Sequence, residues 1–363
     1  MRIPDGVRLW SLATGRVFSD RPAGAVLYLS PWSPDVNHTQ PVPTVPATRR
    51  LMTGAMLVCL AMSLLPVLVL ARGEHGRADS ASEVVWGGPG MAEGRFCVPR
   101  AMTIDAEDRL YIVDKAARIQ VFTADGQFLR GWRTPAWENG KPTGLSIDRG
   151  GNLLVADTHY YRVLVYAPTG QLLGERTLGG TPGNQPGQFG WVTDVVQDPQ
   201  GCYYVAEYGE YDRIQKLDAR GRFLCQWGGH GSQPGQFLRP QSLALDGEGQ
   251  LWVADACNHR IQVFDVRGDV PRLVRLWGGE GSRPGQLRYP YDLVLDPQDH
   301  VYVCEFGNHR VQKFTLQGAS LGTWGIRGRA NGQLNNPWAL VRDSCGRIHV
   351  LDTYNQRVQR VRL

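Results

Sequence analysis

Short apolar runs dominate the chain from residue 83 to residue 363. They are four to six residues long, are rich in Val, Leu, Ile and Tyr, and include "LYIVD", "LLVAD", "YYVAE" and "LWVAD". Turn formers such as Asp-Gly, Gly-Gly-Asn and Pro-Gln-Gly separate them. Runs of this composition between turn residues are typical of consecutive antiparallel strands. The pattern predicts an all-β structure with many turns rather than long helices.

The runs recur around an arginine that returns every 44 to 51 residues, each time after a carboxylate that closes an apolar run. The six pairs are Asp114 and Arg118, Asp157 and Arg162, Glu207 and Arg213, Asp255 and Arg260, Glu305 and Arg310, and Asp352 and Arg357. Each unit holds four strands, which cannot bury their own faces alone but can cover one another when stacked radially. The predicted fold is therefore a six-bladed β-propeller of four-stranded blades.

The repeated acid–base pair has a structural interpretation. The carboxylate ends the second strand of a blade and the arginine begins the third, so the two can form an ion pair across the turn. Six equivalent pairs cannot all be catalytic. The Asn-His that precedes Arg260 and Arg310 is then a turn, in which asparagine is expected to take the left-handed conformation. His259 and His309 are replaced elsewhere by Tyr161, Asp212 and Gln356, which indicates a solvent-facing turn rather than a metal site.

The ring is expected to close through the two ends of residues 83–363. The last unit stops after three strands, and "EVVWGG" at 83–88 precedes the first unit. Trp86 matches the tryptophans that end other fourth strands, namely Trp132, Trp227, Trp277 and Trp324. Since proteins avoid open sheet edges, Val84–Trp86 should pair with the strand around Val358–Val361.

The first 82 residues have a different character. Residues 1–50 include a Pro- and Thr-rich stretch, which predicts disorder, and residues 72–82 form a linker. Residues 51–71 carry no charge over 21 positions and follow Arg49 and Arg50. This segment predicts a transmembrane anchor or a cleaved signal peptide, with a buried core helix as the weaker alternative. Either of the first two places the propeller, residues 83–363, outside the cytoplasm, as a membrane-anchored, secreted or periplasmic protein.

Charge and cysteine content narrow the function. The chain has 39 basic and 34 acidic residues, and the excess lies mostly in the first 82 residues. A nearly neutral propeller argues against a nucleic-acid partner, which requires a dense basic face. Six of the seven cysteines are scattered over the blades without a CxxC pair. We expect most of them to be buried, with Cys304 in the core.

"ADACNHRIQVF" and "CEFGNHRVQKF" resemble NHL repeats, and the resemblance extends over 83–363. It implies a six-bladed propeller but no single function, because such propellers include protein-binding platforms, RNA binders, extracellular sensors and the zinc-dependent peptidyl-amidating lyase. The lyase places zinc histidines directly after a proline in three blades. This sequence has other residues there, in Pro99-Arg100, Pro142-Thr143, Pro240-Gln241, Pro290-Tyr291 and Pro337-Trp338. The zinc chemistry cannot be transferred, so no metal, cofactor or catalytic residue is predicted.

The residues that open the first strands should surround the mouth of the central channel. They are Arg100, Thr143, Thr193, Asp194, Gln241, Tyr291, Asp292 and Trp338, with His159, Tyr208, Cys257, Phe306 and Tyr354 on the turns above. A polar and aromatic rim that differs in every blade suits a ligand site, although ordinary exposed loop residues are the competing interpretation. We expect a monomeric scaffold or sensor module that binds a protein or small ligand. The alternative is a metal-dependent lyase or hydrolase that uses Asp194 and Asp292.

Overall fold

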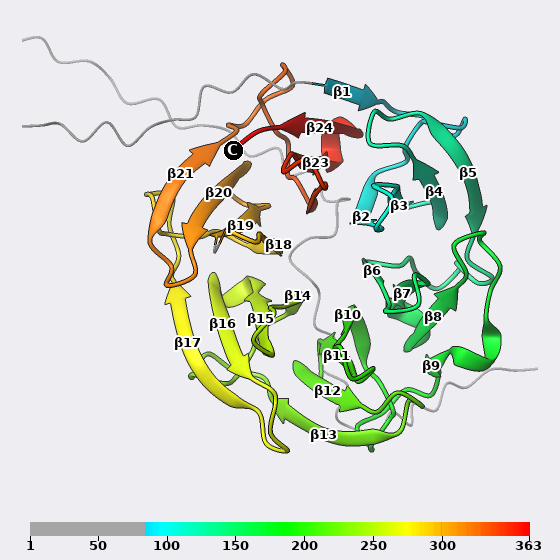
Figure 1. Cartoon of the computed structure of the whole chain (residues 1–363), viewed down its shortest axis with the longest axis vertical. Coiled ribbons are helices and arrows are strands. Elements are labelled where there is room, and N and C mark those ends of the chain that lie inside the picture. The colour runs from blue at the N-terminus through cyan, green and yellow to red at the C-terminus, as the bar shows by residue number, and fades with distance from the viewer. Residues whose placement is uncertain (1–83, 299) are drawn as a thin grey trace, which may run out of the picture. The chain divides into compact units, whose positions relative to one another are not determined.

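The computed structural model describes residues 84–298 and 300–363, which form six four-stranded antiparallel sheets arranged as the blades of a ring (Figure 1). The segments predicted at 1–50, 51–71 and 72–82 lie outside the described residues. Among the residues that are described, no helix has the length and apolar character needed to span a bilayer. The predicted six-bladed all-β propeller is confirmed for this part of the chain.

The first three blades follow one another along the chain. Blade one contains β2 (Pro99–Ile104), β3 (Leu110–Asp114), β4 (Arg118–Phe122) and β5 (Phe128–Arg133). Blade two contains β6 (Gly144–Ile147), β7 (Leu153–Asp157), β8 (Arg162–Tyr166) and β9 (Leu178–Gly179), with the short 3-10 helices η1 (Thr158–Tyr160) and η2 (Gly174–Arg176). Blade three contains β10 (Trp191–Gln197), β11 (Tyr203–Tyr208), β12 (Arg213–Leu217) and β13 (Phe223–Gly228).

The last three blades repeat this order until the chain ends. Blade four contains β14 (Pro240–Leu245), β15 (Gln250–Asp255), η3 (Ala256–Asn258), β16 (Arg260–Asp265) and β17 (Arg272–Gly278). Blade five contains β18 (Pro290–Leu295), β19 (His300–Glu305), β20 (Arg310–Thr315) and β21 (Ser320–Trp324). Blade six contains β22 (Ala339–Arg342), β23 (Ile348–Asp352), η4 (Thr353–Asn355), β24 (Arg357–Val361) and the N-terminal β1 (Val84–Gly87).

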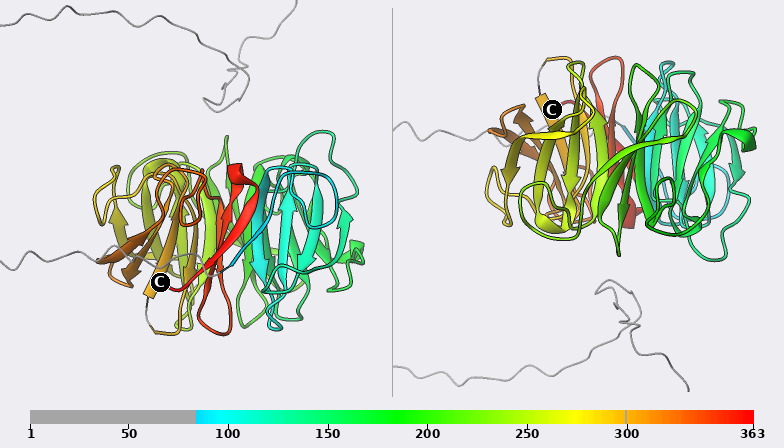
Figure 2. Two further views of the ribbon diagram at one scale, coloured as in Figure 1. Left: turned by 90° about the horizontal axis from the view of Figure 1, so that it is seen from above. Right: turned by 90° about the horizontal axis from the view of Figure 1, so that it is seen from below.

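Apolar clusters lie between neighbouring blades. One cluster combines Met102 and Phe122 of blade one with Ala339, Leu351 and Val358 of blade six. In the regular blades the second and third strands are buried almost throughout, whereas the outer fourth strand alternates between half-buried and exposed residues. Viewed from its sides, the ring has turns on both faces (Figure 2). This arrangement is why a single blade could not fold alone: its apolar faces are covered only by its neighbours.

The ring closes as the sequence predicts. β1 pairs with β24 in antiparallel register, with Trp86 opposite Val358 and Val84 opposite Arg360. The Trp86 ring lies 4.7 Å from the Phe122 ring of blade one. It also covers Gly126, where a Cβ atom would approach the indole to 2.4 Å. The closing strand thus binds blade six through its backbone and blade one through its tryptophan.

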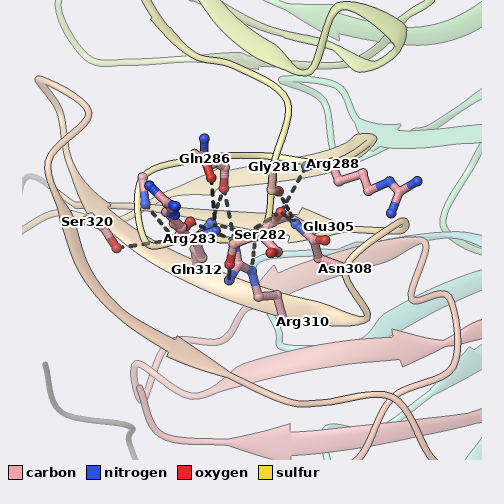
Figure 3. A network of polar contacts seen from close by, with 11 residues as sticks. Gly281, Ser282, Arg283, Gln286, Arg288, Glu305, Asn308, Arg310, Gln312 and Ser320 are labelled. Carbon is pink, nitrogen blue, oxygen red and sulfur yellow. Dashed lines mark hydrogen bonds and ion pairs between the residues drawn. The ribbon is translucent and has the colours of Figure 1, made fainter. Parts of the chain in front are cut away.

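Each repeated acid–base pair is an ion pair, with N–O distances between 2.5 and 3.0 Å. In blade five, Arg310 also donates from Nη1 to the Ser282 carbonyl and from Nη2 to the Gln286 carbonyl (Figure 3). Gln312 donates to Glu305 and to the same Gln286 carbonyl. The pair therefore fixes the glycine-rich connector that leads into the blade, which is a structural role.

The turn after the second strand differs from the prediction. His309, not Asn308, takes the left-handed conformation, with φ of 54°. Its Nδ1 accepts a hydrogen bond of 2.9 Å from the backbone N–H of Asn336 in the next blade. Asn308 instead donates to the Gly281 carbonyl of the connector, and His259 repeats the arrangement one blade earlier. The prediction of a solvent-facing histidine was wrong, because this side chain joins two blades.

The cysteine prediction holds only for Cys304, which is buried on β19. The other five described cysteines are not in the core: Cys97, Cys202 and Cys225 are half-buried, and Cys257 and Cys345 are exposed. They lie in turns, connectors or an outer strand, and not on the strands covered by neighbouring blades. All six described cysteines are free thiols.

Candidate ligand site at the channel mouth

A small cavity opens on the ring axis where the first strands begin. Seven of the eight predicted mouth residues line it: Arg100, Thr143, Asp194, Gln241, Tyr291, Asp292 and Trp338. The cavity volume is about 30 Å³, which is room for only about two water molecules. A larger ligand would therefore rest on the mouth and not enter the channel.

A β-bulge at the start of the first strand directs these side chains. In blade one the pairing register shifts by one residue between Pro99 and Ala101, so that Arg100 is skipped. The same shift occurs at the equivalent position in blades three, four and five. A bulge leaves one residue out of the ladder and can redirect its side chain. The unpaired residues are Arg100, Thr193, Gln241 and Tyr291. The position that follows the proline, or that follows Val192 in blade three, is thus singled out by backbone geometry as well as by sequence.

Thr193 is the predicted mouth residue that does not line the cavity. It is fully buried, and its Oγ1 donates a hydrogen bond of 2.5 Å to the Pro240 carbonyl in the next blade. Thr143, Gln241 and Tyr291 are also buried. The interpretation of the whole set as ordinary exposed loop residues is therefore wrong.

The two carboxylates connect blades at the channel wall. Asp194 accepts from the N–H groups of Val195 and Leu243, and Asp292 accepts from Ser242 Oγ and the N–H of Leu340. Burial raises the pKa of Asp194 well above its ordinary value and raises that of Asp292 to about 7. Because their oxygens are occupied by donors from neighbouring blades, these groups stabilise the ring.

Arg239, which sequence reasoning missed, joins Arg100 at the mouth. Its guanidinium lies 4.8 Å from the Tyr208 ring and 5.3 Å from the Tyr291 ring, and its Nε donates to Gln241. The Arg100 guanidinium lies 5.7 Å from the Trp338 ring. Burial, followed by the charge of Arg239, lowers the pKa of Arg100. Two cations therefore share this mouth with aromatic rings.

The position of Arg239 directly before a proline is the feature of the sequence that could have pointed to this residue as part of the mouth. Val98, Arg239, Tyr289 and Asn336 precede the prolines of four blades, and all have φ between 49° and 58°. This left-handed conformation is unfavourable before proline and for a residue with a Cβ. The preceding blade holds it in place; for example, Asp212 accepts from the Arg239 N–H at 2.8 Å. Strained backbone of this kind is often found at functional sites.

Aromatic side chains complete the rim. Tyr291 stacks on Phe306 with ring centroids 4.5 Å apart, and Trp338 lies edge-on to Tyr291 at 4.9 Å. On the opposite arc, Trp191 contacts His159 at 5.6 Å and Tyr208 at 5.2 Å. Burial, and then the charge of Arg100, lower the pKa of His159. The site combines fixed positive charge with ring faces and is suited to binding rather than to an obvious covalent reaction.

A family model for the NHL repeat matches residues 237–264 and 287–314. These ranges cover the last residues of the connectors and the first three strands of blades four and five. The chain contains NHL repeats. Over 142 residues this NHL-repeat propeller is 37% identical to the mouse peptidyl-glycine alpha-amidating monooxygenase, a match that covers 37% of the chain and 14% of that protein. It is 30% identical over 196 residues to human NHL repeat-containing protein 3, covering 47% of the chain and 51% of that protein. The chain thus spans about half or less of these relatives.

The NHL-repeat propeller also resembles solved structures. An auxiliary nutrient binding protein from Bacteroides ovatus superposes with a TM-score of 0.56 at 16% identity, over 77% of this chain and 72% of that one. Identity this low shows the fold alone. Within the described part of the chain, no group of three or more His, Cys, Asp and Glu side chains is arranged to hold a metal ion.

Proposed function

We propose that this NHL-repeat propeller is a binding module whose channel mouth receives an anionic ligand. Arg100 and Arg239 supply the charge, and Tyr208, Tyr291 and Trp338 supply the ring faces around them. The apolar segment 51–71 supports an extracytoplasmic location, which is part of the proposal. The module would then capture or sense a molecule outside the cytoplasm.

The observation that carries the proposal is the unsatisfied guanidinium of Arg100. Its Nε is buried and has no hydrogen-bond partner among the described residues. Buried donors are nearly always paired in native structures, and a charge-assisted bond to an anion is stronger than a neutral one. Trp338 Nε1 is also buried without a described partner, but several interior tryptophans share that property. Arg162 Nη2 and Arg275 Nε are likewise buried without a described partner, but of these three arginines only Arg100 lines the mouth cavity. Its position together with its unpaired Nε makes Arg100 the indicator.

Thermal unfolding of the full-length protein in the presence of small carboxylates and sulfate tests the proposal. A ligand that binds only the folded state stabilises it, by about 2.7 kcal/mol at one hundred times its Kd. We expect an anion to raise the melting temperature of the wild type and to lose this effect in Arg100→Gln and Arg239→Gln. Tyr291→Ala is a poor probe of binding, because Tyr291 packs in an apolar cluster with Phe306 and Trp338 and its loss would also disturb that packing.

Arg133→Gln is the matched control, because Arg133 is exposed, its guanidinium lies 5.6 Å from the exposed Trp137 ring, and it does not line the cavity. It should leave the anion effect intact. Stabilisation by anions that persists in both Arg100→Gln and Arg239→Gln would show that the mouth is not the binding site.

A metal-dependent lyase or hydrolase is the second candidate. The pKa of Asp292, raised to about 7 by burial, lies near the value that suits a general base. Against this, three hydrogen-bond donors already contact the Asp292 carboxylate. Elemental analysis of purified full-length protein separates the candidates: stoichiometric metal that disappears in Asp292→Asn would favour the enzyme.

A further inference from the structure

Trp191 is an aromatic platform beside the mouth. It opens β10, and 39% of its surface is exposed, although it packs against Gly209. A Cβ atom at Gly209, where φ is +95°, would lie 2.9 Å from the six-membered ring of the indole. Only glycine allows the backbone to come this close in that conformation. One face of the indole is thus supported by backbone, and we infer that the other accounts for the exposed area.

The neighbouring rings hold Trp191 without covering it. His159 and Tyr208 are inclined to the indole by 56° and 50°, so neither lies parallel to it. A ligand can therefore stack from one side only and would remain partly in water. This geometry suits a sugar ring, whose C–H groups pack on the negative face of an indole while its hydroxyl groups stay hydrated. A planar aromatic ligand would gain more from an enclosed apolar slot.

Positive charge lies next to this platform. Tyr208 touches Trp191 on one side and lies 4.8 Å from the Arg239 guanidinium on the other. The hydrogen bond given by that guanidinium goes to the neutral Gln241. The nearby carboxylate of Asp212 is occupied by His230 and by the Arg239 backbone N–H. A ligand that stacks on Trp191 would therefore gain from carrying a carboxylate toward Arg239.

We propose that Trp191, Tyr208 and Arg239 bind an acidic saccharide, with a sugar ring on the indole and a uronate carboxylate at the guanidinium. The inference rests on the proposed function and specifies its ligand class. The cavity of about 30 Å³ admits water but not a ring, so the saccharide lies across the mouth from blade three to blade four.

Calorimetric titration of the full-length protein with digalacturonate, the neutral galactose disaccharide and benzoate tests the inference. We expect digalacturonate to bind and both comparators to bind at least roughly tenfold more weakly. Trp191→Ala and Arg239→Gln should each weaken digalacturonate binding roughly tenfold. Trp137→Ala is the matched control, because Trp137 is equally exposed but its ring is already approached by Arg133 and Lys141.

The other possible results of the titration each overturn either the acidic saccharide or the anion-binding function. No binding of digalacturonate, or unchanged binding in Trp191→Ala, overturns the acidic saccharide. Benzoate that binds more tightly than digalacturonate also overturns it, and loss of that benzoate binding in Arg100→Gln would leave the anion-binding function standing. If Arg100→Gln and Arg239→Gln affect none of the anions, the proposed function itself fails.

Discussion

Blades two and five contain the same acid–base pair in different surroundings. In blade five, the Glu305–Arg310 pair is surrounded by hydrogen bonds to the connector and to Gln312 (Figure 3). In blade two, Arg162 bonds Asp157 at 2.8 Å, but Arg162 Nη2 and Asp157 Oδ1 are buried without described partners. The pair is conserved in form between the two blades, whereas the network around it is not.

The sequence of blade two explains the difference. Its preceding connector, "TPAWENGKPT", lacks the Gly-Gln pair found in blades three to six, whose glutamine carbonyl accepts from the arginine of the blade. Leu164 stands where blade five has Gln312. Its fourth strand is only two residues long, and η2 replaces the remainder. The comparison teaches that the repeat is a unit of connector, acid, arginine and glutamine. The ion pair alone does not define it.

The largest expected effect comes from removing the arginine. Arg310→Ala leaves Glu305 buried and uncompensated and also releases the connector, so we expect a loss of about 3–5 kcal/mol. Arg162→Ala also leaves a buried carboxylate, Asp157, without its arginine and removes a contact with the Tyr160 ring. Because it releases no connector, we expect a loss of about 3 kcal/mol, at the lower end of that range. Urea unfolding midpoints of the two variants provide the measurement. Equal losses would mean that the connector contacts contribute nothing.

A smaller effect is expected when blade five is given the residue of blade two. Gln312→Leu leaves the N–H of Gly285, the Gln286 carbonyl and Glu305 short of a partner, which should cost about 1–3 kcal/mol. Gln317→Leu, at an exposed turn position of the same blade, is the control and should change stability by less than about 0.5 kcal/mol. If Gln312→Leu leaves the free energy of unfolding unchanged, the glutamine is not an essential part of the repeat unit.

The smallest effect concerns pH. His309 Nδ1 accepts a hydrogen bond from Asn336 N–H and must be unprotonated to do so. Burial, followed by the charges of Arg327 and Arg288, lowers the pKa of His309 below its ordinary value. A lowered pKa contributes stability that is present above about pH 6.5 and is lost as pH falls toward the folded-state pKa. The contact should therefore weaken in mild acid.

His309→Gln isolates this contribution. Gln356 already serves the same purpose at the ring closure, where its Oε1 accepts from Val98 N–H at 3.3 Å. At pH 7.5 the variant should match the wild type within about 1 kcal/mol, and between pH 6.5 and 5 it should lose less stability. Blade two offers no such switch, because its equivalent, Tyr161, packs against the apolar core. Identical pH profiles for the two proteins would contradict the assignment.

The six blades, the strand order, the acid–base pairs and the closing strand were all predictable from the amino-acid sequence. These features follow from the period of apolar runs and from the shortfall of one strand at the C-terminal end, both of which are properties of chain spacing. Seven of the eight positions named from the sequence line the cavity, because in five blades a proline lies at or just before the start of the first strand and the repeat spacing gives the position in blade three.

The contacts between atoms of neighbouring blades, by contrast, could be seen only in the folded protein. The turn histidines accept hydrogen bonds from residues 27 and 30 positions further along, Thr193 faces the next blade instead of the cavity, and Arg239 reaches the mouth. Each outcome depends on a β-bulge or on a left-handed residue before proline that a neighbouring blade stabilises. Such local conformations are unfavourable in the isolated segment, so the pattern of one repeat could not reveal them.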